Sequence, residues 1–352
     1  MKVVHLTFSM QLGGIETMLV NIVNEQCRTE KVCLMMLNDD YDETVISKVN
    51  PQVEVVNIGR KLGSKNLIDI LKLNYILYSK HPDIIHIHHP SLIKLIARPL
   101  FPCEVVFTMH DIPLANDLPF LSKYKNICAI SESVKAALCK YGYNSRLIEN
   151  GINVDSFEKK QVYKDPIFRI VQVGRLIMKK KGQDITIRVV KKLVDNGKKN
   201  IHLDIIGEGC DVDDLKKMII ELQIDNYVNL LGSRSQDWLN HHYKDYSLFI
   251  QPSRFEGFGL TVAEAMAAKV PVLVSNQEGP MEIIGNGKYG FCFKTGDVDD
   301  CYIQIEKILT TEKDYNMIAA AYKNVETKYS VKRTAKQYLD YYQELIYNSN
   351  GS

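Results

Sequence analysis

Residues 251–267, QPSRFEGFGLTVAEAMA, form a glycine-rich turn between an apolar run and an apolar helical pattern. Glu256 lies in the turn, and Glu264 lies eight residues later, about one turn inside the predicted helix. The backbone N–H groups of residues 259–261 are free at the start of that helix, which suits them to a phosphate. A carboxylate on each side of the turn can accept hydrogen bonds from sugar hydroxyls. The stretch therefore predicts a strand–turn–helix unit that binds a phosphorylated ligand.

The same alternation of strand and helix runs through the chain on both sides of this turn. Short β-rich runs are separated by longer helical patterns such as Ile15–Gln26. Strands that are apolar on both faces and separated by helices indicate parallel sheets covered on two sides. We predict thirteen strands, at residues 2–9, 31–37, 53–58, 83–88, 104–109, 126–130, 145–148, 168–173, 202–206, 227–231, 246–250, 270–274 and 290–293.

Length predicts two domains of this kind. A chain of 352 residues exceeds the size, about 250–300 residues, at which a single core stops growing. The polar segment Glu158–Asp165, closed by Pro166, is the best linker candidate. We predict an α/β fold of two Rossmann-like, doubly wound parallel-sheet domains facing a central cleft, at residues 1–157 and 166–330. A tyrosine-rich terminal helix at residues 331–349 is expected to cross back to the first domain.

Charge and cysteine content exclude several classes. A net charge of +2 and the lack of a nucleic-acid-reading motif argue against a nucleic-acid partner. Eight cysteines without a Cys-x-x-Cys pair are typical of buried free thiols in a reducing compartment. The apolar stretch at the amino terminus is too short to span a bilayer and has no cleavage site, so we expect a cytoplasmic protein.

Two apolar segments, Asn66–Lys80 and Ser91–Phe101, could lie against a membrane. However, the half of the chain through Asp155 carries 16 Lys+Arg and 16 Asp+Glu, without the basic excess that an anionic lipid surface favours. We therefore expect both segments to be helices that face the core. The buried face predicted for the first of them consists of Leu67, Ile70, Leu71, Asn74 and Leu77.

Glycines and histidines of the first half stand at the ends of predicted strands. Gly13 and Gly14 open a helix, where the backbone suits an anion or a sugar hydroxyl, or makes only a tight turn. His110 ends the fifth strand and is placed to meet a ligand, unless its partner is Asp111. His86 and His88 share one strand face, but no third ligand stands at a recognisable spacing, so we expect a structural pair rather than a metal site.

Basic residues of the second half also follow predicted strands. Arg175 and Lys181 lie in one loop, and a guanidinium with an ammonium suits a diphosphate, although a lysine run is usually only solvated surface. At the ends of the next two strands, backbone groups could contact a nucleobase edge at Gly207 and at Gly232, Ser233 and Arg234.

With these motifs in this order, the chain resembles the retaining glycosyltransferases of the GT-B fold, in the family 4 group with a glycogen-synthase-like donor domain. The most specific element is the Glu-x7-Glu motif of Glu256 and Glu264. The loop at Gly13 and Gly14 is similar to the family's amino-terminal glycine loop, and residues 150–155 resemble its hinge segment.

The resemblance implies a role for each residue. Arg175 and Lys181 neutralise the diphosphate, Glu264 bonds the ribose, Glu256 bonds sugar hydroxyls, and His110 faces the donor sugar. The loop before Lys181 is one residue longer than the common pattern, which leaves Lys180 as an alternative. The backbone that completes the site belongs to Gly14, Phe258, Gly259, Leu260 and Thr261.

The implied function is retaining transfer of a sugar from a uridine or guanosine diphosphate sugar to a glycan or lipid-linked glycan, as in bacterial surface polysaccharide synthesis. Fixed cations and helix N–H groups stabilise the leaving diphosphate, so we expect no metal and no cofactor. We expect a monomer or homodimer, with possible peripheral contact at the inner membrane face. The alternatives are a nucleotide-sugar epimerase or hydrolase on the same fold and a non-catalytic partner.

Overall fold

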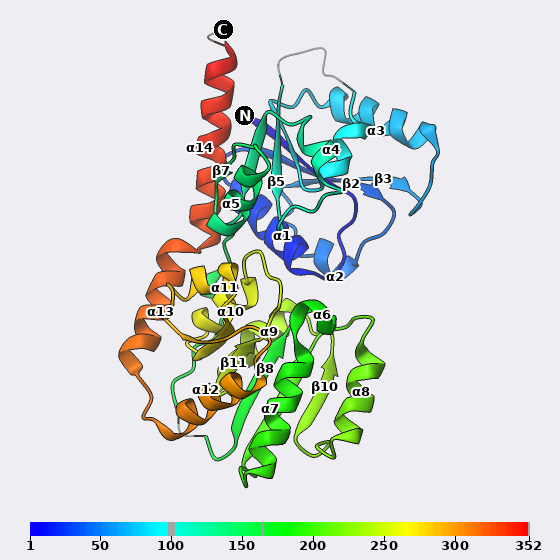
Figure 1. Ribbon diagram of the computed structural model, residues 1–352. Coiled ribbons are helices and arrows are strands. Elements are labelled where there is room, and N and C mark those ends of the chain that lie inside the picture. The colour runs from blue at the N-terminus through cyan, green and yellow to red at the C-terminus, as the bar shows by residue number, and fades with distance from the viewer. Residues whose placement is uncertain (98–102, 164, 351–352) are drawn as a thin grey trace. The chain divides into compact units, whose positions relative to one another are not determined.

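The computed structural model describes residues 1–97, 103–163 and 165–350, and the chain divides into two compact α/β units (Figure 1). The first unit comprises Met1–Ile152 together with Ser330–Ser352, and the second comprises Asn153–Tyr329. Each unit is built on one parallel sheet with helices packed against it. The predicted fold of two Rossmann-like parallel-sheet domains is confirmed.

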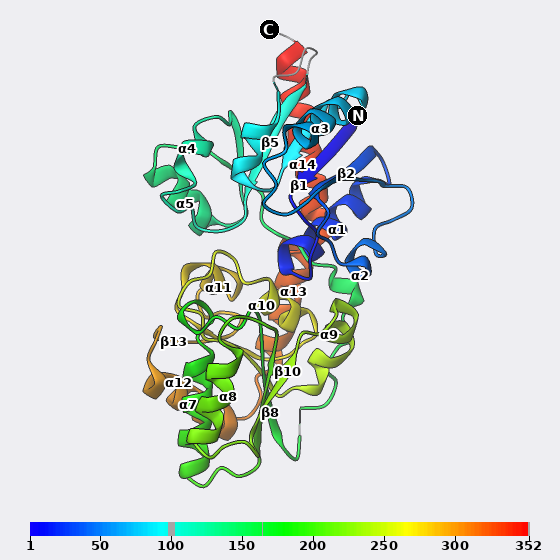
Figure 2. The ribbon, with the colours of Figure 1, turned by 90° about the vertical axis from the view of Figure 1, so that its right-hand side faces the viewer.

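The first unit contains a seven-stranded parallel sheet in the order β3-β2-β1-β4-β5-β6-β7. Strands β2 and β4 are buried along nearly their whole length, because helices cover the sheet on both sides (Figure 2). The strands are β1 (Lys2–Thr7), β2 (Lys31–Asn38), β3 (Glu54–Arg60), β4 (Ile84–Ile87), β5 (Glu104–Met109), β6 (Asn126–Ala129) and β7 (Arg146–Leu147). The helices are α1 (Gly14–Gln26), α2 (Glu43–Ile46), α3 (Leu67–Ser79), the 3-10 helix η1 (Pro90–Leu95), α4 (Leu118–Leu121), α5 (Glu132–Lys140) and α14 (Val331–Asn350).

Helix α14, the last of the chain, is part of the first unit because its tyrosines are buried there. The Tyr342 hydroxyl is 2.5 Å from Nδ1 of His86, and the Tyr338 hydroxyl is 2.9 Å from Oγ1 of Thr108. The chain leaves this unit after Ile152 and returns at Ser330, and these two residues form an isolated parallel bridge. The two crossing points therefore lie side by side.

The second unit contains a six-stranded parallel sheet in the order β10-β9-β8-β11-β12-β13. Its core is a cluster of aliphatic side chains from the sheet and from the helices α7, α8 and α12. The strands are β8 (Phe168–Val173), β9 (Ile201–Ile206), β10 (Val228–Gly232), β11 (Leu248–Gln251), β12 (Val272–Ser275) and β13 (Phe291–Phe293). The helices are η2 (Val154–Ser156), α6 (Met178–Lys181), α7 (Gln183–Asp195), α8 (Val212–Glu221), α9 (Gln236–His242), η3 (Tyr243–Asp245), α10 (Leu260–Ala267), α11 (Glu278–Ile283), α12 (Val298–Thr310) and α13 (Tyr315–Lys328).

The polar segment Glu158–Asp165 is not the connection between the units. The chain passes between them at Ile152 and Asn153, and the polar segment packs onto the second unit. The backbone N–H of Lys160 donates to the carbonyl of Ala268 at 2.9 Å, and its buried ammonium lies 3.0 Å from Asp165. Its polar side chains have partners inside the unit, which a composition argument does not reveal.

The predicted buried face of α3 is wrong at Leu67 and Leu71. Both are about 70% exposed, whereas Leu73 and Leu77 are buried. The error arises because α3 is apolar around most of its circumference, so the apolar pattern does not select the inner face. Of the other expected helix, residues 90–95 form η1, and residues 98–101 lie outside the described residues.

One smaller expectation, on the burial of the cysteines, also changes. No cysteine among the described residues is paired, but Cys139 and Cys210 are exposed rather than buried. In the described part of the chain, no helix is both long enough and apolar enough to cross a membrane.

Candidate functional site

The predicted basic and acidic residues of the second unit meet at the carboxyl ends of neighbouring strands. Lys181 is the last residue of α6, which follows β8, and Glu256 lies in the turn between β11 and α10. Nζ of Lys181 is 2.5 Å from Oε2 of Glu256, and both side chains are partly exposed. Sheet order explains the contact, because β8 and β11 are adjacent although the two residues are far apart in sequence.

Gln251, the last residue of β11, connects both sides of the glycine turn. Its Nε2 donates to Oε2 of Glu256 at 2.7 Å, and its Oε1 accepts from Oγ1 of Thr261 at 3.0 Å. Sequence reasoning did not assign this residue. The signal available in the sequence was a glutamine at the end of an otherwise apolar run.

The conformation of the glycine turn depends on a backbone geometry that favours glycine. Gly259 is the N-cap of α10 and has φ +102° and ψ +52°, a conformation that side-chain-bearing residues rarely adopt. The Phe258 ring is buried and packs edge-to-face on Tyr329 with ring centroids 5.5 Å apart, so Phe258 presents its backbone to the turn. Leu260 and Thr261 then start the helix with their N–H groups free of helical partners.

Glu264 is buried inside α10 and has two hydrogen-bond donors. The Tyr243 hydroxyl donates to Oε2 at 2.9 Å, and Nε2 of Gln236 donates to Oε1 at 3.2 Å. Desolvation outweighs both donors and raises the pKa of Glu264 to about 7. This carboxyl changes charge near neutral pH, and Tyr243 and Gln236, neither of which was predicted, orient it.

Arg254 fastens the Glu256 turn to α6 and α7. Its Nη1 and Nη2 each lie 2.8 Å from a carboxylate oxygen of Asp184, and Nη1 also donates to the Met178 carbonyl at 2.7 Å. The backbone N–H of Arg254 donates to the Lys180 carbonyl at 2.8 Å. A forked guanidinium–carboxylate pair fixes direction as well as distance. Arg254 therefore positions the loop that carries Glu256 against the end of α6.

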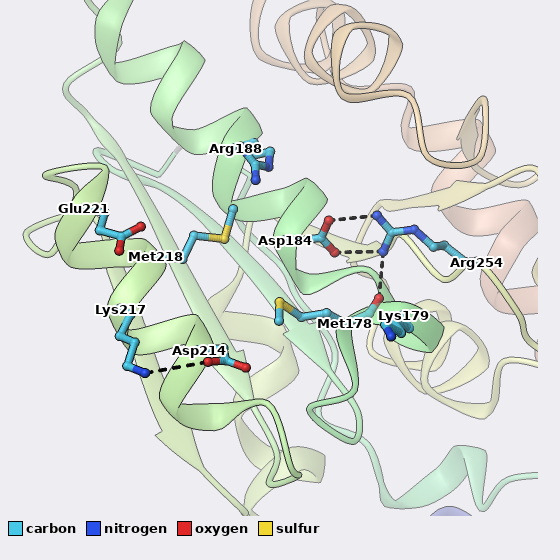
Figure 3. A pocket seen from close by; sticks show the side chains of 9 residues that line it. All are labelled: Met178, Lys179, Asp184, Arg188, Asp214, Lys217, Met218, Glu221 and Arg254. Atoms are coloured by element: carbon cyan, nitrogen blue, oxygen red, sulfur yellow. Dashed lines mark hydrogen bonds and ion pairs between the residues drawn. The ribbon is translucent and has the colours of Figure 1, made fainter.

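A cavity of about 620 Å³ lies between α6, α7 and α8, next to the Arg254–Asp184 ion pair (Figure 3). None of the predicted site residues lines it. Four of its seven charged groups form ion pairs with one another, Arg254 with Asp184 and Lys217 with Asp214. The cavity is therefore separate from the glycine turn. Its lining consists of Met178, Lys179, Asp184, Arg188, Asp214, Lys217, Met218, Glu221 and Arg254.

The other predicted residues of this unit lie in loops after β8, β9 and β10. The Arg175 side chain is exposed and makes no hydrogen bond to another described residue, while its carbonyl accepts from Nε2 of Gln183 at 2.8 Å. Gly207 has φ +140°, and a Cβ there would lie 2.0 Å from the Gly174 carbonyl oxygen. The β8 and β9 loops therefore pack backbone to backbone.

The loop after β10 contains Gly232, Ser233 and Arg234. The Gly232 carbonyl accepts from the N–H of Gly207 at 2.9 Å. The Arg234 guanidinium is exposed and lies 5.7 Å from the centroid of the Trp238 ring. This loop therefore adjoins the Gly207 loop at the carboxyl edge of the sheet.

In the first unit, the predicted glycines start α1. Gly13 is the N-cap and Gly14 the first residue of the helix, and the Gly13 carbonyl accepts from the Thr17 N–H at 3.0 Å. Gly14 is exposed at this helix start.

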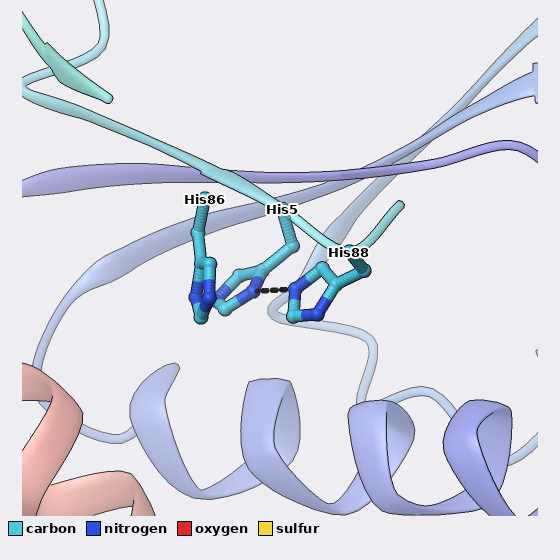
Figure 4. A group of neighbouring side chains, drawn as sticks. All are labelled: His5, His86 and His88. Carbon is cyan, nitrogen blue, oxygen red and sulfur yellow. Dashed lines mark hydrogen bonds between the residues drawn. The ribbon is translucent and has the colours of Figure 1, made fainter. Parts of the chain in front are cut away.

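Three buried histidines of the first unit gather beside β1 and β4. His5 joins the predicted pair His86 and His88, and nitrogen atoms of all three lie within 4.8 Å of one another (Figure 4). Sequence spacing gave no third ligand for the pair, and the third imidazole comes from His5 on the neighbouring parallel strand, opposite His86. The ring nitrogens already have protein partners, so a metal ion would have to displace hydrogen bonds.

His110 is connected to this group. Its Nε2 lies 3.0 Å from Nδ1 of His88, Nε2 of His88 lies 3.0 Å from Nδ1 of His5, and Nε2 of His5 lies 2.7 Å from Oε1 of Gln26. Burial lowers the pKa of His5 and of His110 to about 4 and that of His88 well below its ordinary value. These imidazoles are therefore neutral at physiological pH.

Residues 12–156 match the family model described as Glycosyltransferase Family 4, and residues 153–325 match the one described as Glycosyl transferases group 1. An uncharacterized glycosyltransferase of Methanocaldococcus jannaschii is 30% identical over 66% of this chain and 64% of its own length. A capsular polysaccharide biosynthesis glycosyltransferase of Staphylococcus aureus is 29% identical over 64% of this chain and 63% of its own length. The chain thus spans less than two thirds of either relative.

Among solved structures, Anabaena HepE in complex with UDP and glucose superposes with a TM-score of 0.79 at 19% identity, over 97% of this chain and 98% of that one. Two parallel-sheet units with this likeness define a protein of the GT-B glycosyltransferase fold. The two family models together match residues 12–325, so the chain belongs to the glycosyltransferases, which confirms the family and the fold of the resemblance seen in its motifs. Retention of configuration and the roles of the Glu-x7-Glu residues stay predictions.

Proposed function

We propose that the protein is a retaining glycosyltransferase that moves a sugar from a uridine or guanosine diphosphate sugar to a glycan or lipid-linked glycan acceptor. The observation that supports this most is the Lys181–Glu256 pair, 2.5 Å apart at a glycine turn that opens a helix. The capsular polysaccharide name of the S. aureus relative supports a place in bacterial surface polysaccharide synthesis. A cytoplasmic location is part of the same proposal.

Charge development at the leaving group explains the basic residues. Cleavage of a sugar–diphosphate bond builds negative charge on the diphosphate and positive charge on the sugar. Arg175, Lys181 and the N–H groups at the start of α10 would stabilise the diphosphate, as fixed charges and dipoles that need no metal ion. We therefore propose a metal-independent transfer.

Each carboxylate of the Glu-x7-Glu motif would bind a different part of the donor. Glu264, buried beside Tyr243, would accept hydrogen bonds from the ribose. Glu256 would bond hydroxyls of the transferred sugar. Since Glu256 holds Lys181 in the described structure, donor binding would exchange that contact for one between Lys181 and phosphate.

Retention of the anomeric configuration would follow from transfer on one face of the sugar. The leaving phosphate would accept the proton of the acceptor hydroxyl, so no protein carboxylate acts as a nucleophile. An NMR spectrum of the product that shows an inverted anomeric proton would exclude this route.

Nucleotide binding tests the proposal directly. The protein would be screened with uridine, guanosine and adenosine diphosphates and their sugars for a rise in thermal unfolding temperature, in the presence of EDTA. We expect uridine or guanosine diphosphate to stabilise the wild type and Lys179→Ala, a neighbouring exposed lysine, but not Lys181→Ala. If the nucleotide stabilised the wild type, Lys179→Ala and Lys181→Ala by the same amount, Lys181 would not be part of the binding site. Rapid epimerisation of a donor without acceptor would instead favour an epimerase.

A further inference from the structure

Helix α3 turns an apolar face to solvent. Leu67, Ile68, Leu71 and Tyr75 on the helix and Leu62 in the preceding loop are 68–78% exposed; these five residues are called the α3 surface. With about 100° between successive helix residues, the four helical ones fall within an arc of about 100°. The inner face of α3 is also apolar, with Leu73 and Leu77 buried. Packing within the unit explains the inner face only, and a contiguous outer patch marks an interaction site.

The charge around the α3 surface is strongly positive. Residues 60–80 contain five basic residues and one acidic residue, Asp69. Lys61 and Lys65 are exposed beside the apolar residues. Lys72 donates from Nζ to the Ile58 carbonyl at 2.6 Å, and Lys80 is paired with Glu54. The balance of acidic and basic residues over the first half of the chain thus hides a local excess. Apolar side chains bordered by lysines match a surface with an apolar interior and negative headgroups.

We propose that the α3 surface docks this protein on an anionic lipid bilayer. Leu67, Leu71 and Tyr75 enter the boundary between headgroups and acyl chains, and the lysines contact lipid phosphates. Helix α3 lies along β3, the edge strand of the sheet, so it is peripheral in its unit (Figure 1). The inference deepens the proposed function and rests on it, because a lipid-linked acceptor is held at such a surface.

Vesicle sedimentation tests the docking without using sugar transfer. The full-length protein would be mixed with vesicles of phosphatidylcholine alone or with about one third phosphatidylglycerol, an anionic content chosen to give a strong surface potential. We expect binding to the anionic vesicles that weakens with salt and falls at least tenfold in Leu71→Ser/Tyr75→Ser. Lys61→Gln/Lys65→Gln should weaken binding and reduce its salt dependence. Unchanged nucleotide binding in these variants would show that the donor site is intact.

A matched control comes from the second unit. Ile220→Ser removes an apolar side chain that is 69% exposed on α8 and should leave vesicle binding unchanged. Failure of the wild type to bind anionic vesicles, or equal binding by Leu71→Ser/Tyr75→Ser, would overturn the proposal while leaving the glycosyltransferase function untouched. A wild-type dimer that the same double substitution converts to a monomer would also overturn it, in favour of a second copy of the chain.

A second and independent observation concerns His110. Ring centroids are 5.3 Å apart in both His5–His88 and His88–His110, with interplanar angles of 18° and 27°. With N···N distances of 3.0 Å, these are nearly coplanar imidazoles joined edge to edge by N–H···N hydrogen bonds. A metal ion bound by three histidines would require the rings to converge on one point, so the geometry favours a hydrogen-bonded chain.

The side-chain oxygen of Gln26 determines which nitrogen donates in each of these histidine hydrogen bonds. Oε1 of Gln26 accepts from Nε2 of His5, so Nδ1 of His5 carries a lone pair and accepts from Nε2 of His88. Nδ1 of His88 then accepts from Nε2 of His110. Nδ1 of His110 is left as a buried lone pair that has no hydrogen-bond partner among the described residues.

We infer that Gln26, His5 and His88 are positioning residues that hold His110 in the Nε2–H tautomer and thereby fix the orientation of its ring. Nitrogen-15 NMR of histidine-labelled protein reads the tautomer directly and does not depend on the proposed reaction. We expect wild-type His110 to be protonated at Nε2 only, and Gln26→Leu to give a mixture of tautomers.

Turnover measurements on Gln26→Leu and on a control variant distinguish an effect on the orientation of His110 from a general loss of stability. In Gln26→Leu, kcat should fall about tenfold with donor KM unchanged. Thr108→Val breaks the hydrogen bond to His86, and His86 is not one of the hydrogen-bonded residues that connect Gln26 to His110. This variant should leave the His110 tautomer unchanged. Protonation of wild-type His110 at Nδ1, or an unchanged tautomer in Gln26→Leu, would refute the inference.

Discussion

Replacing Glu264 with Gln should make the second unit more stable at alkaline pH while weakening donor binding. The Glu264 carboxyl is buried, and its pKa is raised from an ordinary 4.5 to about 7. A raised pKa means that the folded protein favours the neutral form, so stability is lost as pH rises from 4.5 through 7. The difference between the ordinary and the folded-state pKa of Glu264 corresponds to a loss of about 3 kcal/mol in the free energy of unfolding above pH 7. Gln is neutral throughout and removes this cost.

The stability difference between the variant and the wild type is the quantity to measure, at pH 5 and at pH 8. Effects of the amide on shape and hydrogen bonding to Tyr243 and Gln236 are the same at both values and cancel. Trp238 is the chain's single tryptophan and lies in the second unit, so its fluorescence in urea reports the unfolding of that unit. We expect Glu264→Gln to gain about 2–3 kcal/mol relative to the wild type between the two pH values.

Asp213→Asn on α8 is the control, because that carboxylate is exposed. Its difference from the wild type should not change between pH 5 and pH 8. If the difference for Glu264→Gln were equally constant, Glu264 would be ionised at little cost, and the reasoning from burial would be refuted.

Four further substitutions test the donor site. Lys181→Ala and Arg175→Ala should each cost about 2–5 kcal/mol of nucleoside diphosphate binding in calorimetry, and wild-type affinity in both would contradict their assignment. Glu256→Ala should remove most turnover and preserve nucleotide binding, since its proposed contact is to the sugar; loss of nucleotide binding would reverse the roles of the two glutamates. Tyr243→Phe removes a donor to Glu264 and should move the pH midpoint of donor binding upward, and an unmoved midpoint would separate Glu264 from that titration.

The fold was predictable because its signal is local. Each strand is an apolar run bounded by polar or glycine residues, and every predicted strand is present. The inner face of α3 was not predictable, because apolar residues surround the helix and the sequence pattern does not say which of them meets solvent. The same ambiguity concealed the local basic surface within a balanced total.

The site was predictable residue by residue but not contact by contact. Glycines and charged residues after strands mark the carboxyl edge of a parallel sheet. The Lys181–Glu256 pair depends on β8 lying next to β11, which follows from sheet order rather than from spacing. His5 gave no signal, because a histidine inside an apolar strand has the pattern of a core residue. Its partner is known only once β1 and β4 are paired.

The return of α14 to the first unit determines which part of the gene can be separated. Residues 153–329 are one continuous segment, whereas the first unit is assembled from two segments that bracket it. A fragment ending at Ile152 would keep all seven strands of its sheet but leave His86 and Thr108 without the hydroxyls of Tyr342 and Tyr338. A single proteolytic cut inside the second unit would leave both resulting pieces anchored to the first. Truncation can therefore isolate the second unit as one continuous segment, and the first unit only if the terminal helix is supplied with it.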